Sequence, residues 1–402
     1  MGSRLLAGCL ALLLFLILIG SGVLYFLKYQ QDRTVETAHN SALDLFLQPK
    51  RAEGEPLDPL KRREALRIWR GEVIPKGGDR PFVADALYYV AEIVSETEPE
   101  TARGYWQRIV DRFPESDHRD EALVRLAEFS VRTDPEKAKN LYDRVLGSTS
   151  TPELQADAQL GVVLLEDTSE GVPPPEVREK YQQIVTGQPD ARAASKARER
   201  LDQINRFLIF QDPNPNEFKE IYTVKRGDVL LRIANQYETT AYIIEMLNGV
   251  NAKNLHPGQG ILVPTWGKVY AVVDKSEFKL MVFRESDKHF LLQYPVGIGE
   301  LQWKTKAGEY IVATKEIHPA WPDPKTGRVF HYGDPDYPLG ERWMGLAPPS
   351  SPGTRTGLGI HGTNQPETIG TASSAGCVRM TNENAIEAFA VIRLKSRVMI
   401  QE

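Results

Sequence analysis

The sequence predicts a multidomain protein. In chain order we expect an N-terminal transmembrane helix, an all-α repeat region, a small βααβ module and a mostly-β C-terminal domain. Three observations support this fold class: a long uncharged apolar run near the N-terminus, helical segments that recur every 36 to 39 residues, and strand-length apolar runs between turns in the last third of the chain. A length of 402 residues is also typical of two or three domains rather than one.

The composition excludes some classes of function. Apolar residues make up 41% and charged residues 26% of the chain, as in ordinary globular proteins. The formal net charge is only −5 and no basic stripe carries interleaved aromatic residues, so we expect no nucleic-acid partner. The seven histidines show no metal-ligand spacing such as His-x-x-x-His, so we expect no metal site and no other cofactor.

The N-terminal apolar run predicts the compartment. Residues 5–27 carry no charge, and a helix of this length spans ~35 Å at ~1.5 Å per residue, enough to cross the cytoplasmic membrane. We therefore predict a single-pass anchor over residues 1–28, then a linker over residues 29–60 with one helix at residues 35–47. A cleaved signal peptide is the alternative, although its apolar core is usually shorter. The remaining chain is expected in the periplasm or cell wall, mainly because of the motifs described below.

Residues 61–210 predict helices throughout. Trp106, Tyr142 and Tyr181 begin three similar stretches, WQRIVDRFPES, YDRVL and YQQIVTGQPDA, and a small residue four positions before an apolar one follows each of them. This pattern of helical hairpins resembles tetratricopeptide repeats, although the full consensus is absent. An irregular helical bundle is the alternative. In either form the region is expected to bind a protein partner or to act as a spacer.

Residues 220–265 predict a compact βααβ module. Gly227 and Asp228 turn the chain after the first strand, and Asp228 is expected to cap the first helix. Asn248 ends the second helix, and Gly258 turns the chain into the last strand. The stretches YTVKRGDVLLRIANQY, MLNGVN and LHPGQGILVP resemble a LysM domain throughout.

The LysM resemblance implies a function for the module. Domains of that family bind glycan strands that contain N-acetylglucosamine, typically peptidoglycan. Carried over to this chain, the glycan-binding candidates are Gly227, Asp228, Asn248 and Gly258. A βααβ unit that serves only as a spacer is the alternative.

Residues 268–402 predict a β-rich domain. Strand-length runs occur at residues 269–274, 278–283, 289–296, 310–314 and 397–401, and NAIEAFAVIRL predicts one helix at residues 384–394. Proline and glycine are dense between residues 319 and 353, which predicts a long irregular loop or lid. Loops of that length in a compact domain are usually functional.

Cysteine usage points to one reactive thiol. Cys9 lies in the apolar run, so Cys377 is the only thiol in the rest of the chain and is expected to be free. It follows His361 by sixteen residues on a glycine-rich turn, and an imidazole with an ordinary pKa of ~6.5 suits the task of deprotonating a thiol. Gly376 leaves room for backbone N–H groups that could bind an oxyanion. Arg379 shares a face with Cys377 if the chain is extended there, and could lower the thiol pKa or orient the substrate.

The residues around this pair make the interpretation specific. IHGTNQPETIG, SSAGCVRM, TKAGEY and LGERWMGL together resemble the YkuD-type L,D-transpeptidases over residues 268–401. The resemblance implies a β-sandwich-like fold and a cysteine that attacks a carbonyl in cell-wall stem peptides. The sequence departs from the family pattern at two positions. Many members carry a histidine where this chain has Ala375, and proline is usual where this chain has Lys306. Carried over residue by residue, the resemblance implies that Cys377 is the nucleophile and His361 is the general base. It implies that the N–H groups of Gly376 and Cys377 bind the oxyanion and that Ser374 braces the turn. The supporting residues are Arg379, Gly362 and Thr363.

The resemblance also implies a reaction and its partners. Peptidoglycan stem peptides and glycan strands are the expected partners, and the reaction is acyl transfer through a Cys377 thioester that gives 3→3 cross-links or exchanges the terminal D-amino acid. An L,D-carboxypeptidase that uses water, or a weakly active wall-binding scaffold, is the alternative. Sortases separate the histidine and cysteine much further, and papain-like hydrolases place the cysteine first, so both are disfavoured.

Overall fold

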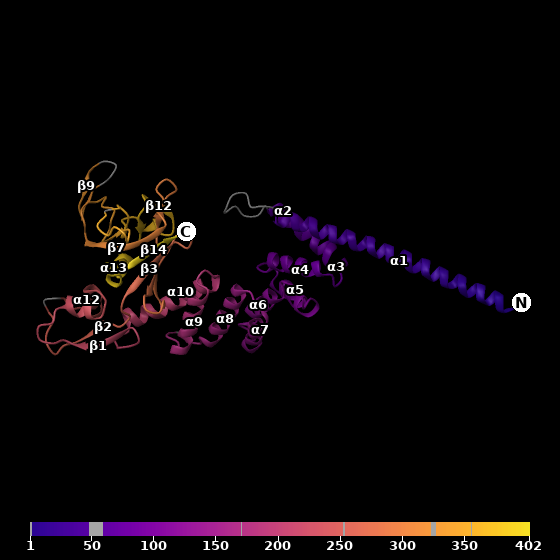
Figure 1. Cartoon of the computed structure of the whole chain (residues 1–402), viewed down its shortest axis with the longest axis horizontal. Coiled ribbons are helices and arrows are strands. Elements are labelled where there is room, and N and C mark those ends of the chain that lie inside the picture. Colours follow the sequence, from indigo (N-terminus) through magenta and orange to yellow (C-terminus); the bar gives the residue numbers. More distant parts are fainter. Residues whose placement is uncertain (1, 48–58, 170, 252–253, 323–326, 355) are drawn as a thin grey trace. The chain divides into compact units, whose positions relative to one another are not determined.

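The computed structural model describes most of the chain (Figure 1). The residues that it describes are 2–47, 59–169, 171–251, 254–322, 327–354 and 356–402, with side chains from residue 20 onward. They form two compact units, Met1–Glu166 and Asp167–Glu402, each with its own hydrophobic core.

The first unit begins with the long helix α1 (Gly2–Leu47). In the part of the chain that the structure describes, no helix is both long and apolar enough to cross a membrane. The anchor predicted at residues 5–27 is therefore not supported, and the side chains of its first part, residues 5–19, lie outside the described residues. The helix also continues into the predicted linker, because no glycine or proline interrupts residues 28–47. Residues 48–58 of that linker lie outside the described residues.

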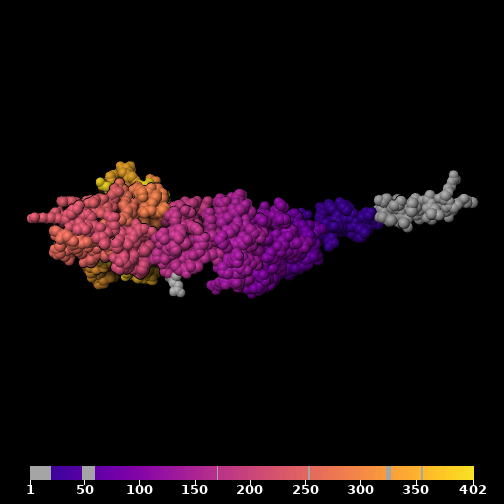
Figure 2. Space-filling view, turned by 90° about the horizontal axis from the view of Figure 1, so that it is seen from below, coloured from indigo at the N-terminus to yellow at the C-terminus, as the bar shows by residue number. Residues whose placement is uncertain are grey.

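The rest of the first unit is helical, as predicted. Several helices carry proline in their first turn, where its missing N–H costs nothing. Neighbouring helices from α4 to α8 pack in chain order, and their surfaces run on continuously in Figure 2. The elements are α2 (Pro59–Ile68), the π-helical turn η1 (Trp69–Val73), α3 (Ile74–Lys76), α4 (Pro81–Val94), α5 (Pro99–Arg112), α6 (Arg119–Ser130), α7 (Pro135–Ser148) and α8 (Pro152–Glu166).

The repeated aromatic residues occupy equivalent places. Trp106, Tyr142 and Tyr181 lie in α5, α7 and α9 (Pro175–Gly187), and all three are buried. Their burial explains why the sequence repeats an aromatic residue at this interval. The hairpin of α9 and α10 (Arg192–Arg206), with the π-helical turn η2 (Phe207–Gln211), belongs to the second unit. The helical region is confirmed, and its assignment to tetratricopeptide repeats stays a prediction.

The βααβ module has the predicted order. Its strands β1 (Lys219–Thr223) and β2 (Gly260–Pro264) pair antiparallel, with α11 (Leu230–Gln236) and α12 (Ala241–Asn248) between them. The expected cap from Asp228 is wrong: α11 starts after Val229 without a side-chain cap. The Asp228 carboxylate instead accepts hydrogen bonds from the Lys225 N–H and the Tyr222 hydroxyl, both at 2.8 Å, and so closes the preceding turn.

The C-terminal domain is built on one eight-stranded mixed sheet in the order β13-β11-β10-β7-β14-β3-β4-β5. Only β11·β13 and β14·β3 are parallel pairs in this sheet. Its strands are β3 (Val269–Asp274), β4 (Lys279–Arg284), β5 (Phe290–Pro295), β7 (Gly308–Ile317), β10 (Arg342–Ala347), β11 (Gly359–His361), β13 (Val378–Arg379) and β14 (Arg397–Gln401).

Short elements complete the domain. The predicted irregular loop holds the hairpin of β8 and β9 and then strand β10, while residues 323–326 lie outside the described residues. Helix α13 packs against β10 and β11 and starts two residues before the predicted position, because the Thr381 hydroxyl caps it through the Asn384 N–H. The remaining elements are β6 (Ile298–Gly299), β8 (Trp321–Pro322), β9 (Val329–Phe330), the 3₁₀ turn η3 (Pro366–Thr368), β12 (Ala372–Ser374) and α13 (Asn382–Val391).

Candidate active site

Two short parallel strands bring the predicted site residues together. His361 ends β11 and lies in register with Arg379 in β13. Cys377 stands directly before β13, and its thiol donates a hydrogen bond to the carbonyl oxygen of Gly357, two residues before β11, at 3.3 Å. Side chains two apart on a strand share a face, so Cys377, Arg379 and His361 face the same side of this edge of the sheet.

The Cys377 thiol is half-buried and free. Burial raises its pKa above the ordinary value, and two neighbours oppose that shift: the Gly359 backbone N–H and the positive charge of Arg379. The raised pKa means that the resting thiol is protonated at neutral pH. If this sulfur acts as a nucleophile, a base has to take its proton.

His361 is suited to take that proton. Its side chain is 5% exposed, and Nδ1 lies 2.6 Å from the Gly362 carbonyl oxygen. A carbonyl only accepts hydrogen bonds, so Nδ1 carries the proton and Nε2 keeps its lone pair. The pKa of His361 is lowered to about 4. Burial is the main cause and the charge of Arg379 contributes, while hydrogen bonds to the Gly362 and Leu339 backbone oppose the shift. The Trp343 ring stacks on the imidazole at 5.5 Å between centroids, which holds the ring in place.

Ser374 ties the turn before the nucleophile. Its hydroxyl donates to the Cys377 carbonyl at 2.7 Å and accepts from the Gly376 N–H at 3.2 Å. Gly376 has φ +108°, a conformation that L side chains rarely adopt. Because the Gly376 N–H is already bonded, it is less available to an oxyanion than sequence reasoning predicted. The structure records no partner for the Cys377 N–H among the residues it describes.

Arg379 is held at both its backbone and its side chain. It exchanges two backbone hydrogen bonds with Gly297, at 2.8 and 2.9 Å. Its guanidinium, 9% exposed with the rest of the side chain, donates to the Ser373 hydroxyl at 2.6 Å and to the Gln365 side-chain oxygen at 3.5 Å. The buried Nε has no partner in the described part of the chain, and burial lowers the pKa of this group. The positive charge is thus fixed beside Cys377 and His361.

Gly362 and Thr363 lie in a tightly packed corner after the base. A Cβ at Gly362 would come closer than 3.0 Å to the side-chain oxygen of Asn382, and so would a Cβ at Gly340, where φ is +60°. The same Asn382 oxygen accepts the Glu341 N–H at 3.1 Å. Thr363 is buried, and its hydroxyl accepts from a nearby backbone N–H at 3.1 Å. Asn382 therefore supports the His361 turn.

Sequence reasoning missed two residues of this site. Asn382 follows Thr381, the residue that caps α13, and carries no sequence signal of its contact with Gly362. Thr305 is part of the TKAGEY stretch, but nothing local shows that its hydroxyl reaches the carbonyl of Gly376, at 2.9 Å. No group of three or more His, Cys, Asp or Glu side chains that could hold a metal occurs within the described ranges.

The four glycan-binding candidates of the βααβ module are two polar residues and two glycines. Asp228 closes its own turn, as described above, and the Asn248 side chain accepts the Leu262 N–H at 2.7 Å, so it ties α12 to β2. Gly227 and Gly258 have φ of +90° and +84° with open space around them. The polar candidates are therefore occupied within the module, while the glycines shape its exposed turns.

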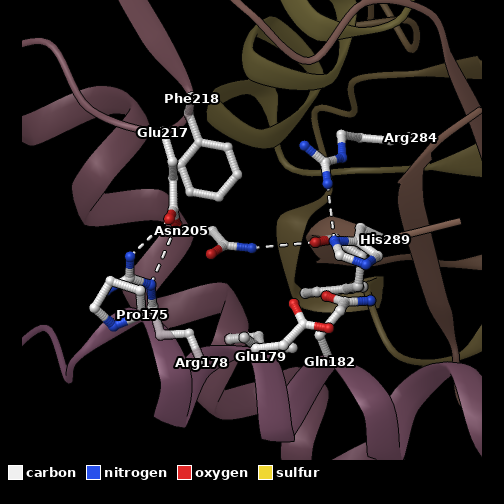
Figure 3. Close-up of a pocket in the computed structure, with 11 residues that line it drawn as sticks. Pro175, Arg178, Glu179, Gln182, Asn205, Glu217, Phe218, Arg284 and His289 are labelled. Carbon is white, nitrogen blue, oxygen red and sulfur yellow. Dashed lines mark hydrogen bonds and ion pairs between the residues drawn. The ribbon is translucent and has the colours of Figure 1, made fainter. Parts of the chain in front are cut away.

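A cavity of about 220 Å³ lies away from Cys377 (Figure 3). The helices α9 and α10, the segment before β1 and the β4–β5 hairpin surround it. Arg178 and Glu217 form an ion pair across one side at 2.6 Å, and Asn205 donates to the Phe290 and Leu291 carbonyls at 3.2 and 2.9 Å. None of the candidate catalytic residues lines this cavity, which is a polar joint between the helical hairpin and the sheet.

Two family models match the chain. Residues 268–400 match the L,D-transpeptidase catalytic domain, YkuD, and residues 222–264 match the LysM domain. The chain is also 32% identical over 139 residues to the putative L,D-transpeptidase YqjB of Bacillus subtilis, a match that covers 35% of this chain and 74% of that protein. The chain belongs to the YkuD family of L,D-transpeptidases. The family and the LysM module predicted from the sequence are confirmed.

Other relatives agree with this membership. The putative L,D-transpeptidases YkuD of Bacillus licheniformis and Bacillus subtilis are 27% and 26% identical over 185 and 182 residues, which are 45% and 44% of this chain and 98% and 97% of those proteins. Among solved structures, L,D-transpeptidases from Mycobacterium smegmatis and Enterococcus faecium are 17% and 18% identical. Those matches cover 36% and 33% of this chain and only 64% and 50% of those chains, with TM-scores of 0.27 and 0.26 that add nothing to the assignment.

Proposed function

We propose that residues 268–402 form a peptidoglycan L,D-transpeptidase in which Cys377 is the nucleophile and His361 its base. Family membership supports the reaction class. The observation that supports the assignment of residues is the β11–β13 pairing, in which His361 lies in register with Arg379 and Cys377 stands directly before β13. Burial at this edge of the sheet favours the neutral imidazole and the protonated thiol.

The first step forms a thioester. As the Cys377 sulfur attacks the carbonyl carbon between the third residue of a tetrapeptide stem and its terminal D-alanine, His361 Nε2 takes the thiol proton. The carbonyl oxygen becomes negative and accepts a hydrogen bond from the Cys377 N–H. The tetrahedral intermediate then breaks the carbon–nitrogen bond, and D-alanine leaves with the proton that His361 returns.

The second step releases the enzyme. An amine from a second stem attacks the thioester carbonyl and loses a proton to His361. The carbon–sulfur bond then breaks, the Cys377 sulfur takes that proton back from His361, and a 3→3 cross-link is formed. A free D-amino acid as acceptor gives exchange of the terminal residue, and water gives carboxypeptidation. Product analysis with a disaccharide-tetrapeptide separates these three outcomes, because dimer, exchanged monomer and tripeptide differ in mass.

The accessory parts support a cell-wall context. The LysM domain is proposed to hold the enzyme on glycan strands, which raises the local concentration of stems near Cys377. The membrane anchor and the protein partner predicted for the helical region are not supported by the described residues, and neither is needed for this proposal.

Acylation by a carbapenem tests the proposal. The full chain is incubated with meropenem and examined by intact-protein mass spectrometry, beside a Cys377→Ala variant. We expect one covalent adduct on the parent protein and none on the variant. Folded protein whose thiol reacts with a simple alkylating agent but forms no meropenem adduct would refute the transpeptidase assignment and favour the wall-binding scaffold.

A further inference from the structure

The hydroxyl of Thr305 bridges two segments at the nucleophile's turn. Thr305 lies between β6 and β7, and its side chain is 2% exposed. Its Oγ1 accepts the Gly299 N–H at 2.8 Å and donates to the Gly376 carbonyl at 2.9 Å. An N–H only donates and a carbonyl only accepts, so the direction of both bonds is settled by chemistry. The single proton of this hydroxyl is therefore committed to the Gly376 carbonyl.

That carbonyl belongs to the same peptide unit as the Cys377 N–H. A peptide unit is planar, and the described chain contains no cis peptide bond, so the C=O and N–H of this unit point in opposite directions. Because Thr305 holds the Gly376 oxygen on one side of the turn, the Cys377 N–H points to the opposite side. The Cys377 N–H is the predicted oxyanion donor with no recorded partner in the described residues.

Close packing leaves little freedom at this contact. A Cβ at Gly299 would come closer than 3.0 Å to the Thr305 nitrogen and to the Gly376 Cα. The backbones of β6, Thr305 and the turn therefore touch directly. The hydrogen bonds of Ser374 tie the turn to itself through the Gly376 N–H and the Cys377 carbonyl. The bond from Thr305 instead ties the turn to the segment between β6 and β7 and, through Gly299, to β6.

We propose that Thr305 is a positioning residue that aims the Cys377 N–H at the oxygen that becomes negative during acylation. The inference rests on the proposed function and assigns a role to the peptide unit before the nucleophile rather than to the thiol itself. A preorganised donor matters most when charge develops on the oxygen, and much less for reactions at sulfur that create no oxyanion.

Two reactions of the Cys377 sulfur distinguish an effect on the oxyanion donor from an effect on the thiol. Acylation by meropenem passes through an oxyanion, whereas alkylation by iodoacetamide is a displacement at carbon that needs only the thiolate. Both rates are measured on the full-length parent protein, Thr305→Val and Thr305→Ser, with melting curves to compare folding. Valine keeps the shape and removes both hydrogen bonds, and serine keeps the hydroxyl.

We expect Thr305→Val to slow meropenem acylation about 10- to 100-fold and to change alkylation less than about threefold, with Thr305→Ser close to the parent protein. If the two rates fall together, or if serine fails to restore acylation, Thr305 only stabilises the fold and the inference is overturned. Unfolded protein would be alkylated but not acylated, so the rates are compared at a temperature where the melting curves show the valine variant to be folded. Alkylation is followed on the Cys377 peptide, because Cys9 is a second thiol. A parent protein that is alkylated but never acylated would instead refute the proposed function, and the inference with it.

Discussion

At the scale of single residues, burial sets the protonation of the proposed reacting pair, His361 and Cys377. His361 and Cys377 both lose water, which favours their neutral forms and moves their pKa values apart, to about 4 for the imidazole and above the ordinary value for the thiol. The pair therefore rests as imidazole and thiol rather than as imidazolium and thiolate. A histidine that is neutral across the physiological range is always ready to act as a base.

The rate of acylation should show this shift. Below its pKa His361 is protonated and cannot accept the thiol proton, so the meropenem acylation rate should stay level from about pH 8 down to about pH 5 and fall only as the pH approaches 4. His361→Gln should be about 10²- to 10⁴-fold slower at pH 7 and lack this acid limb. A midpoint near 6.5, the ordinary histidine value, would contradict the neutral buried base.

The positive charge of Arg379 should lower the pKa of the Cys377 thiol. This charge stabilises the thiolate, so removing the charge raises the pKa of Cys377 further, and Arg379→Gln should shift the pH profile of iodoacetamide alkylation to higher pH. Arg379→Lys keeps the charge and should shift the profile less. An unchanged profile in Arg379→Gln, from protein with a parent-like melting temperature, would limit Arg379 to a structural role.

At the scale of elements, glycines decide how closely helices approach. Gly161 lies in the interior of α8, where a Cβ would come closer than 3.0 Å to the ring of Tyr142 in α7. Gly104 lies in the interior of α5, where a Cβ would meet nothing within 4 Å. The two positions have the same helical backbone and differ in their surroundings.

Replacing each glycine by alanine should therefore have opposite effects. Gly161→Ala should destabilise the first unit by about 1–3 kcal/mol, because the buried Tyr142 ring has to move. Gly104→Ala should stabilise it by about 0.5–1 kcal/mol, because alanine loses less backbone entropy in a helix. Urea unfolding followed by circular dichroism measures both, and a stabilising Gly161→Ala would show that α7 and α8 are not packed as closely as described.

At the scale of the whole second unit, the LysM domain and the catalytic domain share one core. The buried residues of α11 and α12 belong to the same hydrophobic cluster as those of the sheet. The Thr240 hydroxyl before α12 donates to the Ala390 carbonyl of α13, and the Tyr242 ring meets Phe389 edge-on at 4.9 Å. Helix α13 also starts at Asn382, beside the turn of His361. The LysM domain is thus packed onto the helix that supports the base, not joined by a free linker.

A core mutation in the LysM domain should therefore weaken the catalytic sheet. Ile233 is 1% exposed in α11, and Ile233→Ala should cost about 2–5 kcal/mol and speed hydrogen exchange in β3 and β14. Ile109→Ala, at a fully buried position in the separate core of the first unit, is the matched control and should leave exchange in those strands unchanged. Unchanged exchange in Ile233→Ala would mean that the two domains unfold independently.

Local patterns were enough to predict much of this protein. The βααβ module could be recognised because its turns and strands lie within one short stretch, and strands such as β14 have the predicted bounds because apolar alternation is a local property. Cys377, His361 and Arg379 were found from two short motifs. Their juxtaposition follows once β11 and β13 pair, since a parallel pair places the motif ends at one edge.

The sequence by itself thus determined the order of the helical, LysM and catalytic regions, the family and the candidate reacting side chains, because each depends on residues close together in the chain. Only the tertiary structure decided the strand order, the contact of Thr305 with a carbonyl 71 residues away, the place of Asn382 between two glycines, and the packing of the LysM domain on α13. The physical reason is that hydrogen bonds and close contacts between distant segments leave no periodic trace in either segment. They exist only after the sheet has brought those segments together.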